Sequence, residues 1–129
     1  MKRLIPALFA GLLMLTGCAA PSAGAESYRR ITMQEAIDMM STETGYIILD
    51  VRTAEEYAAG HIPGAINIPN ESIGTSAPPA LPDKDQLILV YCRSGNRSRQ
   101  ASARLAALGY TRVTEFGGIS AWPGDIVTN

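Results

Sequence analysis

The sequence predicts an α/β fold in which a mostly parallel sheet carries helices on both faces. Two observations lead to this prediction. Short apolar runs rich in β-branched residues alternate several times with helix-like segments, and such alternation is typical of parallel sheets. The chain has 129 residues, which indicates one domain, and no internal repeat divides it.

The first predicted elements are a helix, a strand and a second helix. Residues 32–41 begin with Thr32 and Glu35 at the spacing of a capping box, which predicts a helix N-terminus. Residues 45–52 form a short apolar run that predicts a buried strand. Residues 53–60 open with a capping threonine and end in glycine, so they predict a short helix.

A less regular segment precedes the clearest strand pattern. Residues 65–69 predict a second short strand. Residues 70–85 are rich in proline, serine and glycine, and they predict a loop with at most one helical turn. Residues 86–92 then form an apolar run that predicts a buried strand.

The last third of the chain predicts a helix, a strand and a terminal turn. In residues 96–109, apolar side chains recur at helical spacing and Gly109 ends the pattern. These side chains are Ala101, Leu105 and Leu108. Residues 111–116 predict the last strand, and residues 118–124 a turn or short helix that places Trp122 in the core or in a pocket wall.

The N-terminus differs in kind from the rest. A basic start and an apolar stretch from residue 4 to residue 15 predict a secretory signal that is too short to span a bilayer. The sequence "LTGC", residues 15–18, resembles the bacterial lipobox. This resemblance implies removal of residues 1–17 and lipidation of Cys18. An ordinary signal peptide in which Cys18 is incidental is the alternative.

The lipobox resemblance also implies a bacterial source and a location. The protein is then exported and anchored to a membrane by its lipid, facing the periplasm or the exterior, and Ala19 favours the outer membrane of a Gram-negative cell. Residues 18–27 are small and polar and predict a flexible tether, so residues 28–129 are the predicted folded domain. We expect a monomer.

Composition argues against two classes of partner. The formal net charge of −1 provides no general basic field for nucleic acid, so we expect no nucleic-acid partner. His61 is the only histidine, which argues against a zinc site. We expect no metal and no organic cofactor.

Cys92 is the candidate nucleophile. If Cys18 is lipidated, Cys92 is the remaining thiol and has no partner within the chain for a disulfide. It follows a predicted strand and precedes a predicted helix, where parallel sheets bind ligands. Loop amides, the helix dipole and the charges of Arg93 and Arg97 favour the thiolate and lower its pKa. The alternative is an inert, buried cysteine that acts as a small apolar side chain.

An anion-binding loop around a thiolate suits phosphoryl transfer through a phosphocysteine or sulfur transfer through a persulfide. Phosphatases and related arsenate reductases of this architecture resemble Cys-x5-Arg. In this chain the spacing from Cys92 to Arg97 is Cys-x4-Arg, and Ser98 holds the position of the phosphatase arginine. A tighter ring suits one sulfur atom better than a phosphate.

Three motifs together resemble the single-domain rhodanese family of sulfurtransferases. They are "LDVRTAEEYAAGHIPGAINIP" at residues 49–69, "YCRSGNRS" at residues 91–98 and "GYTRVTEFGGISAW" at residues 109–122. The resemblance implies a three-layer sandwich. It also implies that Cys92 takes the outer sulfur from a thiosulfate-like anion or a persulfide donor and passes it to a thiol or cyanide. The implied substrate-binding loop comprises Arg93, Ser94, Gly95, Asn96, Arg97 and Ser98.

Supporting residues have structural interpretations. We expect His61 to hydrogen-bond nearby backbone rather than pair with Cys92, and Asp50 and Arg52 to brace the loops, with Glu56 in reach of Arg52. Ser98 either hydrogen-bonds the thiolate or caps the helix, and the cap is the default. Two further side chains are expected on a solvated helix face: Arg99 and Arg104.

Two other functions stay open. A persulfide carrier that docks on a partner would keep the same loop but turn over small donors poorly. A phosphatase or arsenate-reductase relative is less compatible with the Cys-x4-Arg spacing.

Overall fold

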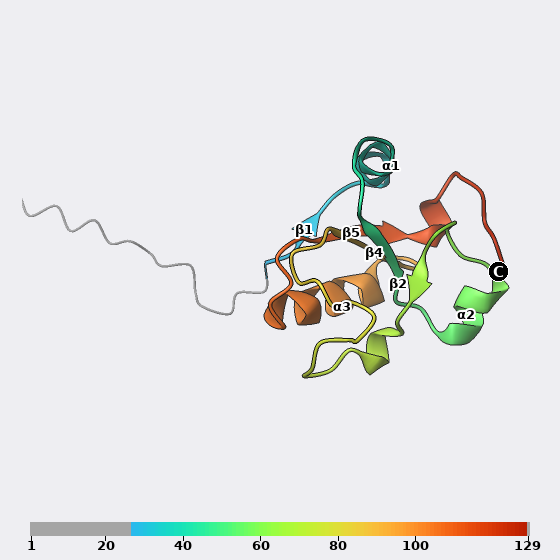
Figure 1. Cartoon of the computed structure of the whole chain (residues 1–129). Coiled ribbons are helices and arrows are strands. Elements are labelled where there is room, and N and C mark those ends of the chain that lie inside the picture. Colours follow the sequence, from blue (N-terminus) through green and yellow to red (C-terminus); the bar gives the residue numbers. More distant parts are fainter. Residues whose placement is uncertain (1–26, 129) are drawn as a thin grey trace, which may run out of the picture.

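The computed structural model describes residues 27–128, which form a sheet flanked by helices (Figure 1). The predicted signal peptide, the lipidation site Cys18 and most of the predicted tether lie outside the described residues. In chain order, the strands and helices are β1 Arg29–Arg30, α1 Met33–Thr42, β2 Ile47–Asp50, α2 Ala54–Ala59, β3 Ile66–Asn67, η1 Asn70–Ser72, β4 Ile88–Cys92, α3 Asn96–Ala107, β5 Val113–Gly118 and η2 Ile119–Ala121. Every predicted element is present. The capping box at Thr32 and the cap at Thr53 are confirmed, and the structure shows that Thr53 also forms a capping box, with Glu56.

All strand pairs in the sheet are parallel, in the order β1-β5-β4-β2-β3. After β3 the chain crosses β2 to reach β4, so the strand order reverses between β2 and β4. Ligands of parallel sheets bind at the carboxyl ends of strands beside such a reversal. Asp50 ends β2 and Cys92 ends β4, which places both at this edge.

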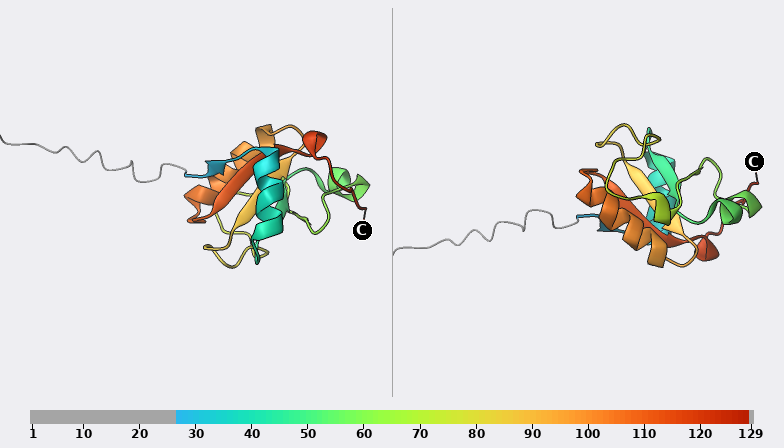
Figure 2. Two further views of the ribbon diagram at one scale, coloured as in Figure 1. Left: turned by 90° about the horizontal axis from the view of Figure 1, so that it is seen from above. Right: turned by 90° about the horizontal axis from the view of Figure 1, so that it is seen from below.

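The helices cover both faces of the sheet, as predicted (Figure 2). Two apolar clusters lie between the layers. On one face, α3 packs Ala101 and Leu105 against β4. On the other, α1 packs Ala36 against the opposite side of the same strand. Strand β4 is buried along its whole length because both layers meet on it.

Strand β1 was not predicted from the sequence. Its two residues, Arg29 and Arg30, are exposed and carry no apolar pattern. The strand pairs with β5 through the main chain, and the N–H of Ile31 donates to the carbonyl of Glu115. Side-chain patterns cannot detect a two-residue strand whose side chains are exposed and whose pairing is made by backbone groups.

Candidate functional site

Cys92 lies at the junction of β4 and α3, and the loop between them folds over its sulfur. The residue is 1 % exposed. The N–H of Gly95 donates to Cys92 Sγ at 3.0 Å. Gly95 has a φ of 113°, a conformation that favours glycine, and it immediately precedes α3. The loop therefore points main-chain N–H groups at the sulfur.

These groups determine the direction in which the thiol pKa moves. Burial raises the pKa of Cys92. The hydrogen bond to the Ser98 side chain and the backbone N–H groups of Ser98, Gly95 and Ser94 lower the pKa by more, so it lies below that of an ordinary thiol. The thiolate is therefore favoured despite the burial of the sulfur, as the sequence predicts.

Gly118 at the end of β5 lets the active loop lie close to the sheet. The pairing of β4 with β5 shifts register after Val90, and Cys92 then pairs with Gly118. A Cβ at Gly118 would overlap the Arg93 carbonyl and lie 2.6 Å from Ser94 Cα. The N–H and hydroxyl of Ser120 both donate to that carbonyl, at 3.3 and 3.0 Å. The start of the loop is thereby attached to the end of β5.

Arg97 is bound by a carboxylate rather than left free over the loop. Its two terminal nitrogens donate to the two oxygens of Glu56 at 2.6 and 3.0 Å. These hydrogen bonds raise the pKa of Arg97, and the charge of Cys92 adds to the effect. The sequence-based expectation that Glu56 pairs with Arg52 is wrong, because Glu56 binds Arg97 and Arg52 binds Asp50.

Ser98 does not cap α3. The N-cap residue is Gly95 and no side chain caps the helix there. Ser98 is instead buried beneath the loop, with its Oγ 3.4 Å from Cys92 Sγ and 2.7 Å from Glu115 Oε1. The default interpretation of Ser98 as a cap is therefore wrong.

Glu115 is the site residue that sequence reasoning missed. It pairs in register with Val90 on β4, so its side chain lies on the same side of the sheet as Val90 and Cys92. The available signal was a charged residue two positions after Val113 in a predicted buried strand, since strand residues two apart share a face.

Asp50 and Arg52 form a buried ion pair beside the site. Arg52 donates to Asp50 through Nε and Nη2, the latter at 2.7 Å, and also to the carbonyl of Gly60 at 2.6 Å. The Tyr91 hydroxyl donates to Asp50 Oδ2 at 2.6 Å. Burial, followed by this hydrogen bond to Asp50, raises the pKa of Tyr91. The Tyr91 hydroxyl therefore joins the end of β4 to this ion pair at the end of β2.

His61 lies against α2. Its ring stacks on Tyr57 with 3.7 Å between ring centroids, and Nδ1 lies 2.9 Å from the Tyr57 carbonyl. Its backbone pairs with Val127 near the end of the described chain. These contacts account for the ring without any role at the sulfur.

Of the remaining predicted residues, some are exposed on the active loop and others are half-buried against neighbouring elements. Arg93, Ser94 and Asn96 are exposed on the active loop. Arg104 is half-buried and donates to Asn70 Oδ1 at 2.8 Å, so the prediction of a purely solvated side chain is wrong. It attaches α3 to η1. Arg99 is also half-buried and donates to Asn96, and Trp122 packs on the cluster beneath α1.

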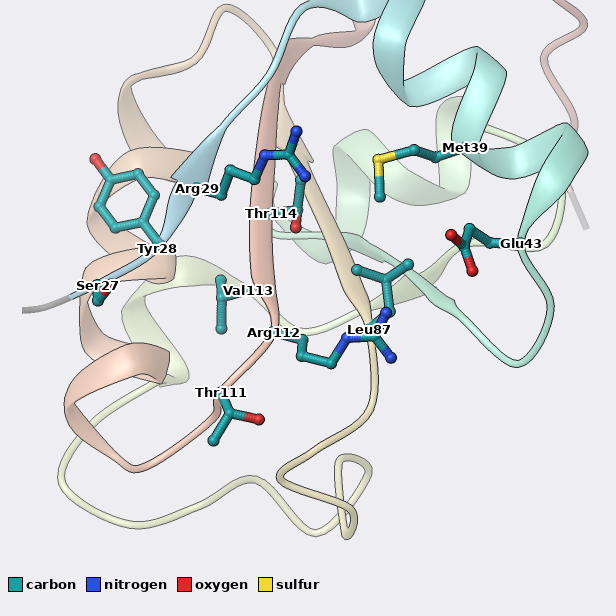
Figure 3. A pocket seen from close by; sticks show the side chains of 10 residues that line it. All are labelled: Ser27, Tyr28, Arg29, Met39, Glu43, Leu87, Thr111, Arg112, Val113 and Thr114. Atoms are coloured by element: carbon teal, nitrogen blue, oxygen red, sulfur yellow. The ribbon is translucent and has the colours of Figure 1, made fainter.

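A separate pocket lies at the opposite end of the sheet (Figure 3). Its lining includes Arg29 at the start of β1, Leu87 just before β4 and Arg112 just before β5. It therefore opens at the amino ends of the strands, away from Cys92. Among residues 27–128, no three His, Cys, Asp or Glu side chains gather as a metal site, and no helix is long and apolar enough to cross a membrane.

The fold and the site define a parallel α/β protein with a buried cysteine in an amide-lined loop at the end of a central strand. Comparison with known proteins then identifies the family. The family model described as "Rhodanese-like domain" matches residues 32–125. The chain belongs to the rhodanese-like family, and it is a sulfurtransferase of the rhodanese type.

Named relatives agree with this assignment. The chain is 42 % identical over 71 residues to thiosulfate sulfurtransferase PspE of Escherichia coli K12, covering 55 % of this chain and 68 % of that protein. It is 34 % identical over 103 residues to thiosulfate sulfurtransferase GlpE of Pseudomonas entomophila, covering 76 % and 91 %. A solved structure described as "rhodanese with anions from E. coli" aligns with a TM-score of 0.57 and 36 % identity, covering 65 % of this chain and 99 % of that one.

Proposed function

We propose that the protein transfers sulfur through a persulfide on Cys92. The thiolate attacks the outer sulfur of a thiosulfate-like anion, the sulfur–sulfur bond of the donor breaks and sulfite leaves with its electron pair. An acceptor thiolate or cyanide then attacks the terminal sulfur and Cys92 leaves as a thiolate. Neither step needs a metal or an organic cofactor.

The observation that carries this proposal is the 3.0 Å hydrogen bond from the Gly95 N–H to Cys92 Sγ. Main-chain donors directed at a sulfur atom favour its negative charge, which is present on the thiolate and on the terminal sulfur of a persulfide. The same main-chain N–H groups and the exposed Arg93 suit a negatively charged sulfur-donor substrate. The solved E. coli relative is described as a rhodanese with anions, and the names of PspE and GlpE specify thiosulfate, which supports an anion of this class.

Mass spectrometry of the intact protein tests the covalent step. After incubation with thiosulfate, we expect the mass of one additional sulfur atom, located on the peptide that contains Cys92. Cys92→Ser must lack this gain, and Cys18→Ser is the matched control that must retain it. No gain on Cys92 under conditions in which PspE gains sulfur would refute the proposal.

A steady-state assay of sulfur transfer from thiosulfate to cyanide separates an enzyme from a carrier. We expect repeated turnover. A protein that gains the persulfide but transfers it only to a protein thiol is a carrier. Hydrolysis of a phosphate ester would instead support the phosphatase alternative, which the position of Ser98 disfavours, because a hydroxyl rather than a guanidinium lies beside the sulfur.

The anchor is a separate proposal that rests on the lipobox-like sequence. We propose that lipid on Cys18 holds a monomeric domain on the periplasmic or outer face of a bacterial membrane. Because β1 runs parallel to β4, the chain enters the domain from the end of the sheet opposite Cys92. An anchor before residue 27 would therefore be attached at the end of the domain opposite Cys92.

Labelled palmitate tests the anchor. We expect label in the wild-type protein and its recovery with membranes, and neither in Cys18→Ser. Cys92→Ser is the control that keeps both. Equal membrane recovery of Cys18→Ser and wild type would contradict lipid anchoring at this cysteine.

A further inference from the structure

A buried acidic side chain that the persulfide mechanism does not use lies beneath the nucleophile. Glu115 is 3 % exposed. Its Oε1 accepts from the Ser98 hydroxyl at 2.7 Å and from the Gly117 N–H at 2.8 Å, and its Oε2 lies 3.6 Å from Arg30 Nε. Three donors around one carboxyl group fit the ionised form, which only accepts hydrogen bonds.

Ser98 has one hydroxyl proton, and several acceptors compete for it. Glu115 Oε1 is the nearest at 2.7 Å, the Gly95 carbonyl lies at 3.0 Å and Cys92 Sγ at 3.4 Å. When Ser98 donates to Glu115, its oxygen offers a lone pair to the sulfur and fits a Cys92 S–H donor. Ser98 can stabilise the thiolate only when its proton turns away from Glu115.

The geometry points to Glu115 as a positioning residue that sets the ionisation of Cys92 through Ser98. This inference rests on the proposed role of Cys92 as the nucleophile. Glu115 competes with the sulfur for the Ser98 proton, which weakens the hydrogen bond by which Ser98 stabilises the thiolate, and it places a negative charge within about 6 Å of the sulfur. Both effects favour the thiol and oppose the loop amides.

Other charged groups near Cys92 have no comparable route to the sulfur. Arg97 on α3 favours the thiolate through space, but Glu56 from α2 binds its guanidinium and Glu71 of η1 also acts on it. Arg30 on β1 pairs with Glu115 and is largely exposed. Among residues 27–128, Glu115 is the charged residue whose side chain hydrogen-bonds the same hydroxyl, that of Ser98, as Cys92 does.

This balance affects both halves of sulfur transfer. A thiol of higher pKa gives a stronger nucleophile per thiolate but a poorer leaving group, and attack is fastest when the thiol pKa lies near the ambient pH. Cys92 must attack the donor in one step and leave from the acceptor in the next. By opposing the amides, Glu115 keeps Cys92 nucleophilic enough for the first step.

The pH dependence of alkylation tests the inference directly. The rate of reaction with iodoacetamide is measured in the full chain on the peptide containing Cys92, so that Cys18 does not contribute. In Glu115→Gln the charge is lost and the carboxamide can donate to Ser98, so we expect the midpoint to fall by about one pH unit or more. We also expect a lower rate at the high-pH plateau, because the thiolate is a weaker nucleophile.

Control variants isolate the effect. Glu43→Gln alters an exposed glutamate beside the distant pocket and should leave the midpoint unchanged. In a Ser98→Ala background, Glu115→Gln should shift the midpoint by less than about half as much as in wild type, because the hydrogen-bonded route is gone. A shift of equal size would overturn the role of Ser98, and no downward shift in Glu115→Gln would overturn that of Glu115.

A second variant covers the case in which Glu115→Gln does not fold. Arg30 is exposed, and β1 pairs through its main chain, so Arg30→Gln should fold. It leaves the charge of Glu115 less compensated, and we expect the midpoint to rise by a few tenths of a pH unit; an unchanged or lower midpoint would overturn the inference. Alkylation needs no sulfur donor, so these results do not depend on whether a persulfide forms.

Discussion

Replacement of Gly118 by alanine tests whether close contact between β5 and the active loop controls sulfur transfer. The backbone at Gly118 has a φ of −134° and a ψ of 151°, an extended conformation that alanine also adopts. The effect of Gly118→Ala therefore comes from the space that the Cβ needs. That Cβ would overlap the Arg93 carbonyl and lie 2.6 Å from Ser94 Cα.

The size of the required shift follows from ordinary contact distances. Carbon atoms in contact lie about 3.5–4.0 Å apart, so Ser94 must retreat by about 1 Å. The next residue along the chain is Gly95, whose N–H donates to Cys92 Sγ. A misplacement of about 1 Å at a site can cost about 100-fold in rate. We expect this loss in kcat/KM, together with about 1–3 kcal/mol of overpacking cost in stability.

The assay is sulfur transfer from thiosulfate to cyanide, measured beside urea unfolding. Gly74→Ala is the matched control, because an added Cβ there has nothing within 4 Å and the position is exposed. It should keep wild-type activity and stability. A folded Gly118→Ala protein with activity within about threefold of wild type would refute the reasoning, because a shift of 1 Å at the loop predicts a far larger loss.

Three further predictions concern stability, each measured by urea unfolding. Glu56→Gln should destabilise the protein by about 1 kcal/mol at pH 7, because the half-exposed pair with Arg97 is weakened by solvent screening. The hydrogen bond from Arg97 lowers the pKa of Glu56 to about 2. The stabilisation by this pair is therefore fully present above the unfolded-state pKa of about 4.3 and is lost as the pH falls towards 2. A stability difference between wild type and Glu56→Gln that stays constant from pH 5 to pH 2 would contradict this. Tyr91→Phe removes a buried donor to Asp50 and should cost about 1–3 kcal/mol, and a cost below about 0.5 kcal/mol would show that the hydroxyl is dispensable. Leu105→Ala leaves a cavity at a fully buried position on α3 and should lower the free energy of unfolding by about 2–5 kcal/mol, while the folded fraction keeps its activity. An unchanged free energy of unfolding would mean that neighbouring side chains fill the cavity.

Local sequence patterns determined every strand and helix except β1, together with the position of Cys92. Apolar runs that alternate with segments of helical periodicity predicted the parallel sheet with helices on both faces. Each element must bury its own apolar face, so its pattern is visible without knowing which elements pack against it. The position of Cys92 between an apolar run and the start of a helix was sufficient to place this residue at the carboxyl end of a strand. The capping box of α1 was also visible, since its partners Thr32 and Glu35 lie three residues apart.

Contacts between residues distant in sequence were decided only by the tertiary structure. Glu56 binds Arg97 across 41 positions. Arg52, only four residues from Glu56 in sequence, is instead bound to the buried Asp50. Glu115 meets Ser98 across 17 positions only after β5 pairs with β4. Sequence spacing describes neighbours along one element, whereas the groups that control the charge of Cys92 come from several elements, and their distances exist only once the sheet has formed.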